Sequence, residues 1–252
     1  MKVLGLDIAS TTGWSVIEDG SLIDYGSIIV DGRMDLPQRL HYFQLELTRV
    51  IQRFNPDYCY IEDVLLGLSG VKILSYLSRL NGVAIVTAYN SLQERVKLYQ
   101  PTYWKSNSLP GLNGSAKKWE VQLAVVKYFR LPITGNFQMI LDTIHNQENQ
   151  IGSIKQSIND NRILINKHKS KIARKRNPPS EDDKQILLDE IKKLELSISN
   201  LNKDKKIIEK SFDKIMNKVS VDISAQTGMT PDICDSCGIA ICGILEHNNN
   251  DH

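Results

Sequence analysis

Four acidic side chains stand where their spacing would suit divalent-cation chemistry. Asp7 ends the apolar run KVLGLD, and Glu62 ends the run YCYIE. Asp232 and Asp235 lie three residues apart, so on a helix both point to one face. Carboxylates are costly to bury unpaired, and carboxylate oxygens are the ligands that Mg²⁺ prefers. Two such ions about 4 Å apart can activate a water and stabilise the leaving oxygen of a phosphodiester.

Each acid also has a purely structural interpretation. Asp232 could be a favourable charge in the first turn of a helix, and Asp235 could simply be solvated. Asp7 could cap a turn, and Glu62 could pair with a lysine. Asp63 is an alternative ligand to Glu62, but adjacent residues of a strand point to opposite faces. The metal interpretation is favoured by the four acids as a set, taken with the order of the elements that carry them.

The hydrophobic pattern predicts three consecutive strands followed by alternating helices and strands. The dipeptide Asp19-Gly20 marks a hairpin between the second and third strands. The later elements are a helix from Pro37 to Asn55, a strand at 58–63, a helix at 71–89, a strand at 95–99 and a helix at 115–130 with Ser115 as its N-cap. This order predicts the α/β class, with a mixed five-stranded sheet and flanking helices.

Residues 140–219 follow a different pattern, with an apolar residue every seventh position. The first seam holds Ile144, Ile151, Ile158, Ile165 and Ile172, then Leu187, Leu194, Leu201, Ile208 and Ile215; the second holds Ile191, Ile198, Phe212 and Val219, with Lys205 as the exception. Asn177-Pro178-Pro179-Ser180 separates the two runs. Sustained heptads around a break predict an antiparallel coiled-coil hairpin. Arms of roughly 35 residues would reach on the order of 50 Å.

We therefore divide the chain into three parts. Residues 1–136 form the first part of the core, 137–222 an inserted hairpin, and 223–252 the final helix of the core with a polar tail. Thr230 suits an N-cap and Pro231 the first position of that final helix.

Composition excludes few classes of function. The 252 residues are 41% hydrophobic with a net charge of +2, so bulk charge does not indicate a nucleic-acid binder. No run of about 20 apolar residues exists, which predicts no membrane span and a cytoplasmic protein. The cysteines fall in apolar runs and are expected to be buried thiols: Cys59, Cys234, Cys237 and Cys242. The CxxC pair lacks the second pair of ligands that a zinc site needs.

Five segments, in order across residues 1–133 and 228–246, resemble the RuvC family of Holliday-junction resolvases. They are VLGLDIASTTGWSVI, YIED, RLNGVAIVTAYN, NGSAKKWEVQLAVVKYFRLP and PDICDSCGIAICG. The resemblance implies an RNase H-like fold and a homodimer in which two active sites nick opposed strands of a four-way DNA junction. The products would carry 5′-phosphate and 3′-hydroxyl ends. The family's distribution points to a bacterium or a phage as the source.

The resemblance also implies the roles of individual residues. Asp7, Glu62, Asp232 and Asp235 would be ligands to two Mg²⁺ ions per active site, with Mn²⁺ as a substitute. Lys105 and Lys118 would lie near the scissile phosphate, where a lysine can neutralise charge developing in the transition state. For Lys105, a simple contact with a backbone phosphate is an equal alternative.

Two features depart from the family. An aromatic residue often follows the second acid as a wedge for the junction, and here that position is Leu65, next to Leu66. Such apolar wedges stack poorly on bases. The second departure is the coiled-coil insertion, which compact members of the family lack.

The expected DNA contacts lie on the core and on the hairpin. Those on the core are Ser115, Lys117, Lys118, Trp119, Lys72 and Leu65, with Arg79, Arg95, Lys97 and Lys105 extending a basic surface; those at the hairpin tip are Lys171, Arg174, Lys175 and Arg176. Trp104 and Trp119 are candidates for base stacking, although core packing is the more common fate of tryptophan.

Several alternatives stay open at the level of sequence. The hairpin has three interpretations: a solvated surface with ion pairs, a DNA-binding tip, or a surface for a dimer or another partner. The chain as a whole would act in DNA recombination, repair or replication. This interpretation has two alternatives. One is a nuclease of the same fold acting on flaps, forks or RNA–DNA hybrids, and the other is a non-catalytic scaffold that binds branched DNA.

Overall fold

The structure is a computed structural model that describes residues 1–64, 70–133, 137–173 and 178–250. The chain divides into two compact units. The core unit consists of Met1–Ile133 with Ser220–His252, and the hairpin unit is Thr134–Val219. We describe each unit by itself.

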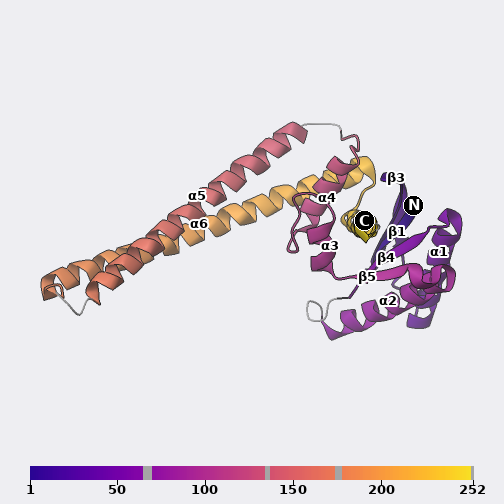
Figure 1. Cartoon of the computed structure of the whole chain (residues 1–252), viewed down its shortest axis with the longest axis horizontal. Helices are drawn as coiled ribbons and strands as arrows, with labels where there is room; N and C mark the ends of the chain where they lie inside the picture. The colour runs from indigo at the N-terminus through magenta and orange to yellow at the C-terminus, as the bar shows by residue number, and fades with distance from the viewer. Residues whose placement is uncertain (65–69, 134–136, 174–177, 251–252) are drawn as a thin grey trace. The chain divides into compact units, whose positions relative to one another are not determined.

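The core unit is built on the predicted five-stranded mixed sheet (Figure 1). Its strands are β1 (Lys2–Asp7), β2 (Thr11–Glu18), β3 (Ser21–Ile29), β4 (Tyr58–Glu62) and β5 (Val96–Tyr99). Their order is β3-β2-β1-β4-β5, with β1, β2 and β3 antiparallel and β1, β4 and β5 parallel. This is the sheet of the RNase H-like fold. Because Leu6 pairs with Ile61, the residues that follow them, Asp7 and Glu62, end their strands at the same edge of the sheet.

Helices cover both faces of the sheet. The first face packs against α1 (Leu36–Phe54) and α2 (Val71–Leu92), with Phe43, Leu47 and Leu80 fully buried. The other face packs against α3 (Pro101–Asn107), α4 (Lys118–Tyr128) and α7 (Pro231–Asn250). A short 3-10 turn, η1 (Gln93–Arg95), joins α2 to β5. The sequence pattern does not predict α3.

The start of α4 differs from the prediction. The helix begins at Lys118 rather than near Ser115. The backbone N–H and hydroxyl of Ser115 both donate to the side-chain oxygen of Asn113, at 2.9 and 2.6 Å. This local turn uses the groups that a cap would need, so Ser115 lies outside the helix. The backbone N–H of Lys117 donates instead to the carboxylate of Glu120.

Helix α7 lies with its backbone directly against β1 and β2. A Cβ atom added to Gly5 would stand 2.1 Å from the carbonyl oxygen of Ser236. A Cβ atom on Gly13 would stand 2.2 Å from the carbonyl oxygen of Asp232. Only glycine at these strand positions permits so close an approach.

Two side chains, the partly buried Tyr25 and the buried Gln122, hold the beginning of α7 in place. The Tyr25 hydroxyl on β3 donates to the carbonyl oxygen of Thr227 at 2.6 Å. The fully buried Gln122 amide on α4 donates to the carbonyl oxygens of Met229, at 2.7 Å, and Ser220, at 3.2 Å. These contacts tie α4 and β3 to the segment that leads into α7.

The hairpin unit contains two long antiparallel helices, α5 (Phe137–Ile172) and the greater part of α6 (Glu181–Thr227). The Asn161 side-chain amide donates to the Ser197 hydroxyl at 3.2 Å, and Lys169 pairs with Glu195 at 3.8 Å. Ile158 and Ile165 are buried as the heptads predict. A polar group such as Asn161 on an apolar seam fixes the register of paired helices.

One predicted seam position is wrong. Ile215 is 38% exposed, whereas its neighbour Met216 is fully buried. A straight α-helix drifts by about 20° per heptad relative to a strict seven-residue repeat. Met216 therefore takes the place of Ile215 on the buried face, while Phe212 and Val219 stay buried as predicted.

No single helix in the described part of the chain is long and apolar enough to cross a membrane. Only α6 and α7 taken together meet the criterion for a span among the described residues, and an 80° bend separates them.

The packing of α7 yields a stability prediction. We expect Gly5→Ala to lower the stability of the core unit by about 1–3 kcal/mol, because the added methyl group would overpack a backbone contact. Urea denaturation followed by tryptophan fluorescence reports on this unit, since Trp14, Trp104 and Trp119 all lie within it. Gly82 is the matched control.

Gly82 is an exposed residue of α2, and a methyl group added to it would meet no atom within 4 Å. Gly82→Ala should therefore stabilise the unit by about 0.5–1 kcal/mol, as glycine in a helix costs that much relative to alanine. Equal denaturation midpoints for Gly5→Ala and the unchanged protein would show that α7 does not depend on the close approach.

Candidate active site

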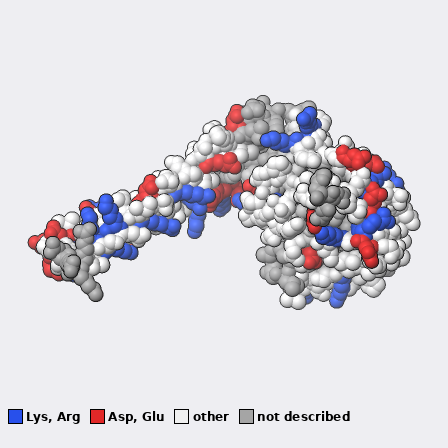
Figure 2. Space-filling model, viewed as in Figure 1, with Lys and Arg blue, Asp and Glu red and all other residues white. Residues whose placement is uncertain are grey.

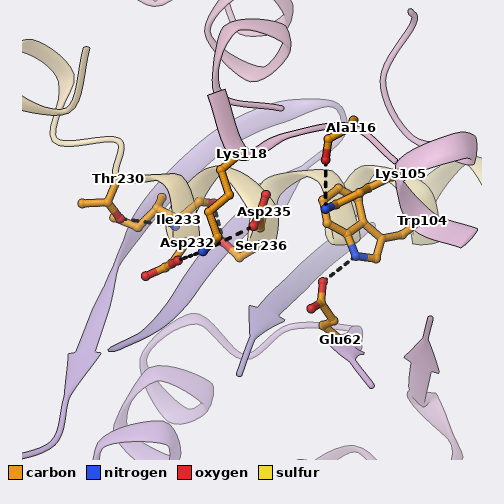
Figure 3. Close-up of polar contacts among 10 residues, drawn as sticks. All are labelled: Glu62, Trp104, Lys105, Ala116, Lys118, Thr230, Asp232, Ile233, Asp235 and Ser236. Atoms are coloured by element: carbon orange, nitrogen blue, oxygen red, sulfur yellow. Dashed lines mark hydrogen bonds and ion pairs between the residues drawn. The ribbon is translucent and has the colours of Figure 1, made fainter. Parts of the chain in front are cut away.

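The four acids named from the sequence come together at one edge of the sheet. Asp7 ends β1, Glu62 ends the neighbouring parallel strand β4, and α7 carries Asp232 and Asp235. The carboxyls of Asp7 and Asp235 are buried, with residue exposures of 6% and 5%. Figure 3 shows Glu62, Asp232 and Asp235 with two lysines between and beside them.

Burial and mutual repulsion disturb the ionisation of these carboxyls. Burial, followed by the charges of Glu62 and Asp235, raises the pKa of Asp7 well above its usual value. Burial is also the largest cause that raises the pKa of Asp235, to about 7, while the positive charge of Lys118 opposes that rise. Burial raises the pKa of Glu62. The protein without a cation therefore stabilises the ionised form of these carboxyls less well than water does.

This group of donors fits a divalent metal ion. All four side chains offer carboxylate oxygens, which suit a hard cation such as Mg²⁺. Oδ1 of Asp235 is buried and accepts no hydrogen bond from any described residue. A buried acceptor without a donor is costly, and a cation would satisfy it.

The carboxylates are not yet arranged around a single point. Among the residues that the structure describes, no three Asp, Glu, His or Cys side chains stand close enough to hold one ion. The Lys118 ammonium pairs with Asp232 and lies 4.0 Å from Asp235 (Figure 3). The Trp104 indole N–H donates to Oε2 of Glu62 at 2.7 Å. Binding a cation would require these side chains to change their contacts.

Lys118 lies beside two of the acids, Asp232 and Asp235. Partial burial lowers the pKa of its ammonium, but the hydrogen bond to Asp232 and the charge of Asp235 outweigh that effect and raise the pKa to about 12. Its side chain is 58% exposed. Lys118 is therefore a protonated group at the open side of the cluster.

Trp104 does not present its ring for base stacking, which corrects one of the two stacking interpretations. The side chain is fully buried, and a Cβ atom on Gly238 of α7 would stand 2.5 Å from its ring. Instead Trp104 orients Glu62, a role that sequence reasoning missed. The position of Trp104 just after β5 could have indicated this role, because β5 pairs with the strand that ends in Glu62.

Lys105 and Asp63 border a cavity next to the acids. The cavity has a volume of about 380 Å³, and its lining includes Glu62, Asp63, Lys105 and Ser115. The Lys105 ammonium donates to the carbonyl oxygen of Ala116 at 3.2 Å. Asp63 instead accepts from the Gln100 amide at 2.8 Å and from the Val64 N–H. These contacts leave Asp63 a poor substitute for Glu62 as a ligand.

The expected DNA contacts are spread over the protein. Ser115 and Lys117 are exposed before α4, Trp119 is half-buried, and Lys72 and Lys171 are exposed on α2 and α5. The remaining predicted contacts, Leu65 with its neighbour Leu66 and Arg174, Lys175 and Arg176, lie outside the described residues. Lys97 pairs with Glu246, so it does not extend a free basic surface.

The cysteines behave as the sequence predicts. Cys59, Cys234, Cys237 and Cys242 are free thiols, and all are buried. Burial raises the pKa of Cys237 and of Cys242 to about 12. These groups pack in the hydrophobic core on both faces of the sheet.

Comparison with known proteins identifies the family. The family model described as crossover junction endodeoxyribonuclease RuvC matches residues 3–145. The chain therefore belongs to the RuvC family of crossover junction endodeoxyribonucleases. The matched residues contain Asp7, Glu62, Lys105 and Lys118, whereas Asp232 and Asp235 lie beyond them.

Curated relatives carry the same name. The RuvC of Magnetococcus marinus is 37% identical over 92 residues, which cover 34% of this chain and 50% of that protein. This chain thus spans half the length of that relative. The RuvC of Ehrlichia chaffeensis is 25% identical over 143 residues, covering 55% of this chain and 89% of that protein.

Two solved structures are also similar. Thermus thermophilus RuvC is 22% identical, with a TM-score of 0.46, over 54% of this chain and 84% of that chain. The structure of Thermus thermophilus RuvC in complex with a Holliday junction substrate is 20% identical, with the same TM-score and coverage.

The contact between Trp104 and Glu62 yields a prediction about the site. Trp104→Phe keeps an aromatic ring in the core but removes the N–H that orients Glu62. We expect the affinity for Mn²⁺, measured by isothermal titration calorimetry, to fall by about 10- to 100-fold, as is typical when a partner of a metal ligand is lost.

Tyr103→Phe is the control, because Tyr103 lies on the same short helix and is 45% exposed. It should leave the Mn²⁺ affinity unchanged. If Trp104→Phe bound Mn²⁺ as the unchanged protein does, the hydrogen bond to Glu62 would have no role in the site.

Proposed function

We propose that the protein is a metal-dependent, structure-selective DNA endonuclease that resolves Holliday junctions by paired phosphodiester hydrolysis. The observation that carries the proposal is the convergence of Asp7, Glu62, Asp232 and Asp235 from three separate elements in a chain of the RuvC family. Buried acids that raise one another's pKa are a common mark of an active site. The relatives named above, and the solved complex of Thermus RuvC with a junction, support four-way DNA as the substrate.

The four carboxylates would hold Mg²⁺ at two ions per active site, and Mn²⁺ should substitute. When bound, such ions lower the pKa of a water and stabilise charge on the phosphate oxygens. The protein's own part is to position the carboxylates at the sheet edge and to present Lys118 on the open side of the cluster. A protonated lysine there can stabilise the negative charge that develops on the scissile phosphate.

The backbone phosphates next to the cut would contact the entrance to α4 and the cavity. The start of α4 is the positive end of the helix dipole and, with the exposed Lys117, forms a favourable site for a phosphate. Lys105 lines the cavity beside Glu62, and its charge favours the ionised form of Glu62. We infer that Lys105 binds a phosphate next to the scissile one.

Paired nicking requires two active sites, so we propose that the protein works as a homodimer. The products would carry 5′-phosphate and 3′-hydroxyl ends. The relatives named above are bacterial, which favours a bacterial or phage genome as the source and DNA recombination, repair or replication as the process.

The test is cleavage of a labelled four-way junction beside a flap and a linear duplex, with Mg²⁺ and with EDTA. We expect paired nicks in the junction that require Mg²⁺. Asp7→Asn should slow nicking by a factor on the order of 100 or more, since the metal supplies several kcal/mol of transition-state stabilisation. Asp63→Asn is the matched control and should cut at close to the normal rate, because the amide keeps an acceptor for the Val64 N–H.

The rival functions are distinct outcomes of the same assay. Preferential cutting of the flap would retain the chemistry and replace the substrate. Binding of all branched DNA without any cutting would contradict the nuclease and leave a scaffold protein.

A further inference from the structure

The outer face of α6 carries a row of exposed lysines that the proposed active site does not use. The face of α6 that meets α5 carries Leu187, Ile191, Leu194, Leu201 and Ile208. Successive residues of a helix are rotated by about 100°. The direction opposite this apolar face therefore falls on Lys192, Lys203, Lys206, Lys210, Lys214 and Lys218, all of which are exposed.

No acidic residue interrupts this lysine stripe. Between positions 192 and 218, all within the described part of α6, the residues that share the outward direction with the lysines are Leu196, Ser199, Asn200, Ile207 and Asn217. The acids of the same stretch point to the flanks, and Glu209 pairs with Lys205 on the side toward α5. The stripe thus presents only positive and neutral groups to solvent.

Ion pairs with the described residues neutralise little of the charge of the stripe. Lys192 pairs with Asp189 at 3.7 Å. No ion pair among the described residues involves the other five lysines of the stripe. The hairpin unit, residues 134–219, holds 17 Lys and Arg against 12 Asp and Glu, whereas the rest of the chain holds 14 against 17. The positive charge of the protein is therefore concentrated on the hairpin, along which Figure 2 shows many Lys and Arg side chains.

The dimensions of the stripe match the backbone of a DNA duplex. Residues 192–218 extend over about 39 Å at 1.5 Å per residue. One helical turn of B-DNA is about 34–36 Å long. From Lys203 to Lys218 neighbouring lysines stand three or four residues apart, about 4.5–6 Å along the axis, and Lys192 lies eleven residues before Lys203. Several ammonium groups can therefore meet successive phosphates at once.

The residue types favour phosphates of a duplex over other ligands. The stripe contains no aromatic side chain, and single-stranded DNA is commonly bound by stacking on aromatic rings. It contains no arginine, the residue that most often reads guanine in the major groove. Its only large apolar residues are Leu196 and Ile207, too few for the core of a protein interface.

We propose that the lysine stripe of α6 binds the phosphate backbone of the double-stranded arms of branched DNA. The inference rests on the proposed function only for the identity of the substrate. The stripe adds affinity that depends on salt but not on base sequence. It lies outside the cleavage chemistry, so the nicking rate of a saturated complex does not depend on it.

The test measures junction binding by fluorescence anisotropy in EDTA, over a series of KCl concentrations. The variant carries Lys206→Gln, Lys210→Gln and Lys214→Gln, and glutamine keeps a high helix propensity. The slope of log K against log[KCl] should become shallower by about 2–3, since each phosphate contact contributes about 0.9. The affinity at moderate salt should fall by a factor on the order of 10.

The control variant removes the same charge from three lysines off the stripe. Lys127→Gln, Lys155→Gln and Lys184→Gln should leave both the slope and the affinity close to those of the unchanged protein. Circular dichroism must show equal helix content in the two variants.

Each outcome bears on the stripe separately from the nuclease. Equal salt slopes for the stripe variant and the unchanged protein would overturn the proposal. A different sedimentation coefficient of the stripe variant relative to the unchanged protein, both without DNA, would also overturn the proposal. It would indicate that the stripe is a surface for a second copy of the chain. A shallower slope in a protein that cuts no junction would support the stripe and contradict the nuclease.

Discussion

The close approach of α7 to the sheet is the contact on which the active site depends. The helix backbone reaches β1 and β2 at Gly5 and Gly13, where any side chain would collide with a carbonyl oxygen of α7. That approach sets Asp232 and Asp235 beside the acids that end β1 and β4. Residues more than 160 positions apart thus come to share one small volume, and their positions follow from backbone packing rather than from flexible side chains.

Assembling those acids has an electrostatic cost that determines the rest of the site. Burial and mutual repulsion raise the pKa of Asp7 and Asp235. Lys118 offsets part of this cost, and the Trp104 indole stabilises Glu62 by a charge-assisted hydrogen bond. A divalent cation would offset more, because it carries twice the charge of a lysine and accepts oxygens from several carboxylates. The negative charges that repel one another without a cation would attract a bound cation and hold it in place.

Sequence patterns predict the sheet, most of the helices and the four acids, because period and strand order are local signals. They do not predict α3 or the start of α4, since these depend on contacts beyond the local pattern. They also do not predict that Met216 rather than Ile215 is buried, because that depends on the accumulated twist of a long helix. For Trp104 the sequence suggests only stacking or packing, and its bond to Glu62 becomes visible once β5 is placed beside β4. The lysine stripe can be identified from the sequence once the side of α6 that meets α5 is known.

The central claim is that β1, β4 and α7 together form one cation site. Replacing Mg²⁺ by Fe²⁺ in the presence of ascorbate and peroxide generates hydroxyl radicals that cut the polypeptide near the bound ion. We predict cuts close to Asp7, Glu62 and residues 232–235, which excess Mg²⁺ should suppress and Asp235→Asn should weaken. Cuts confined to other acids, such as the run Glu181-Asp182-Asp183 at the start of α6, would contradict the account.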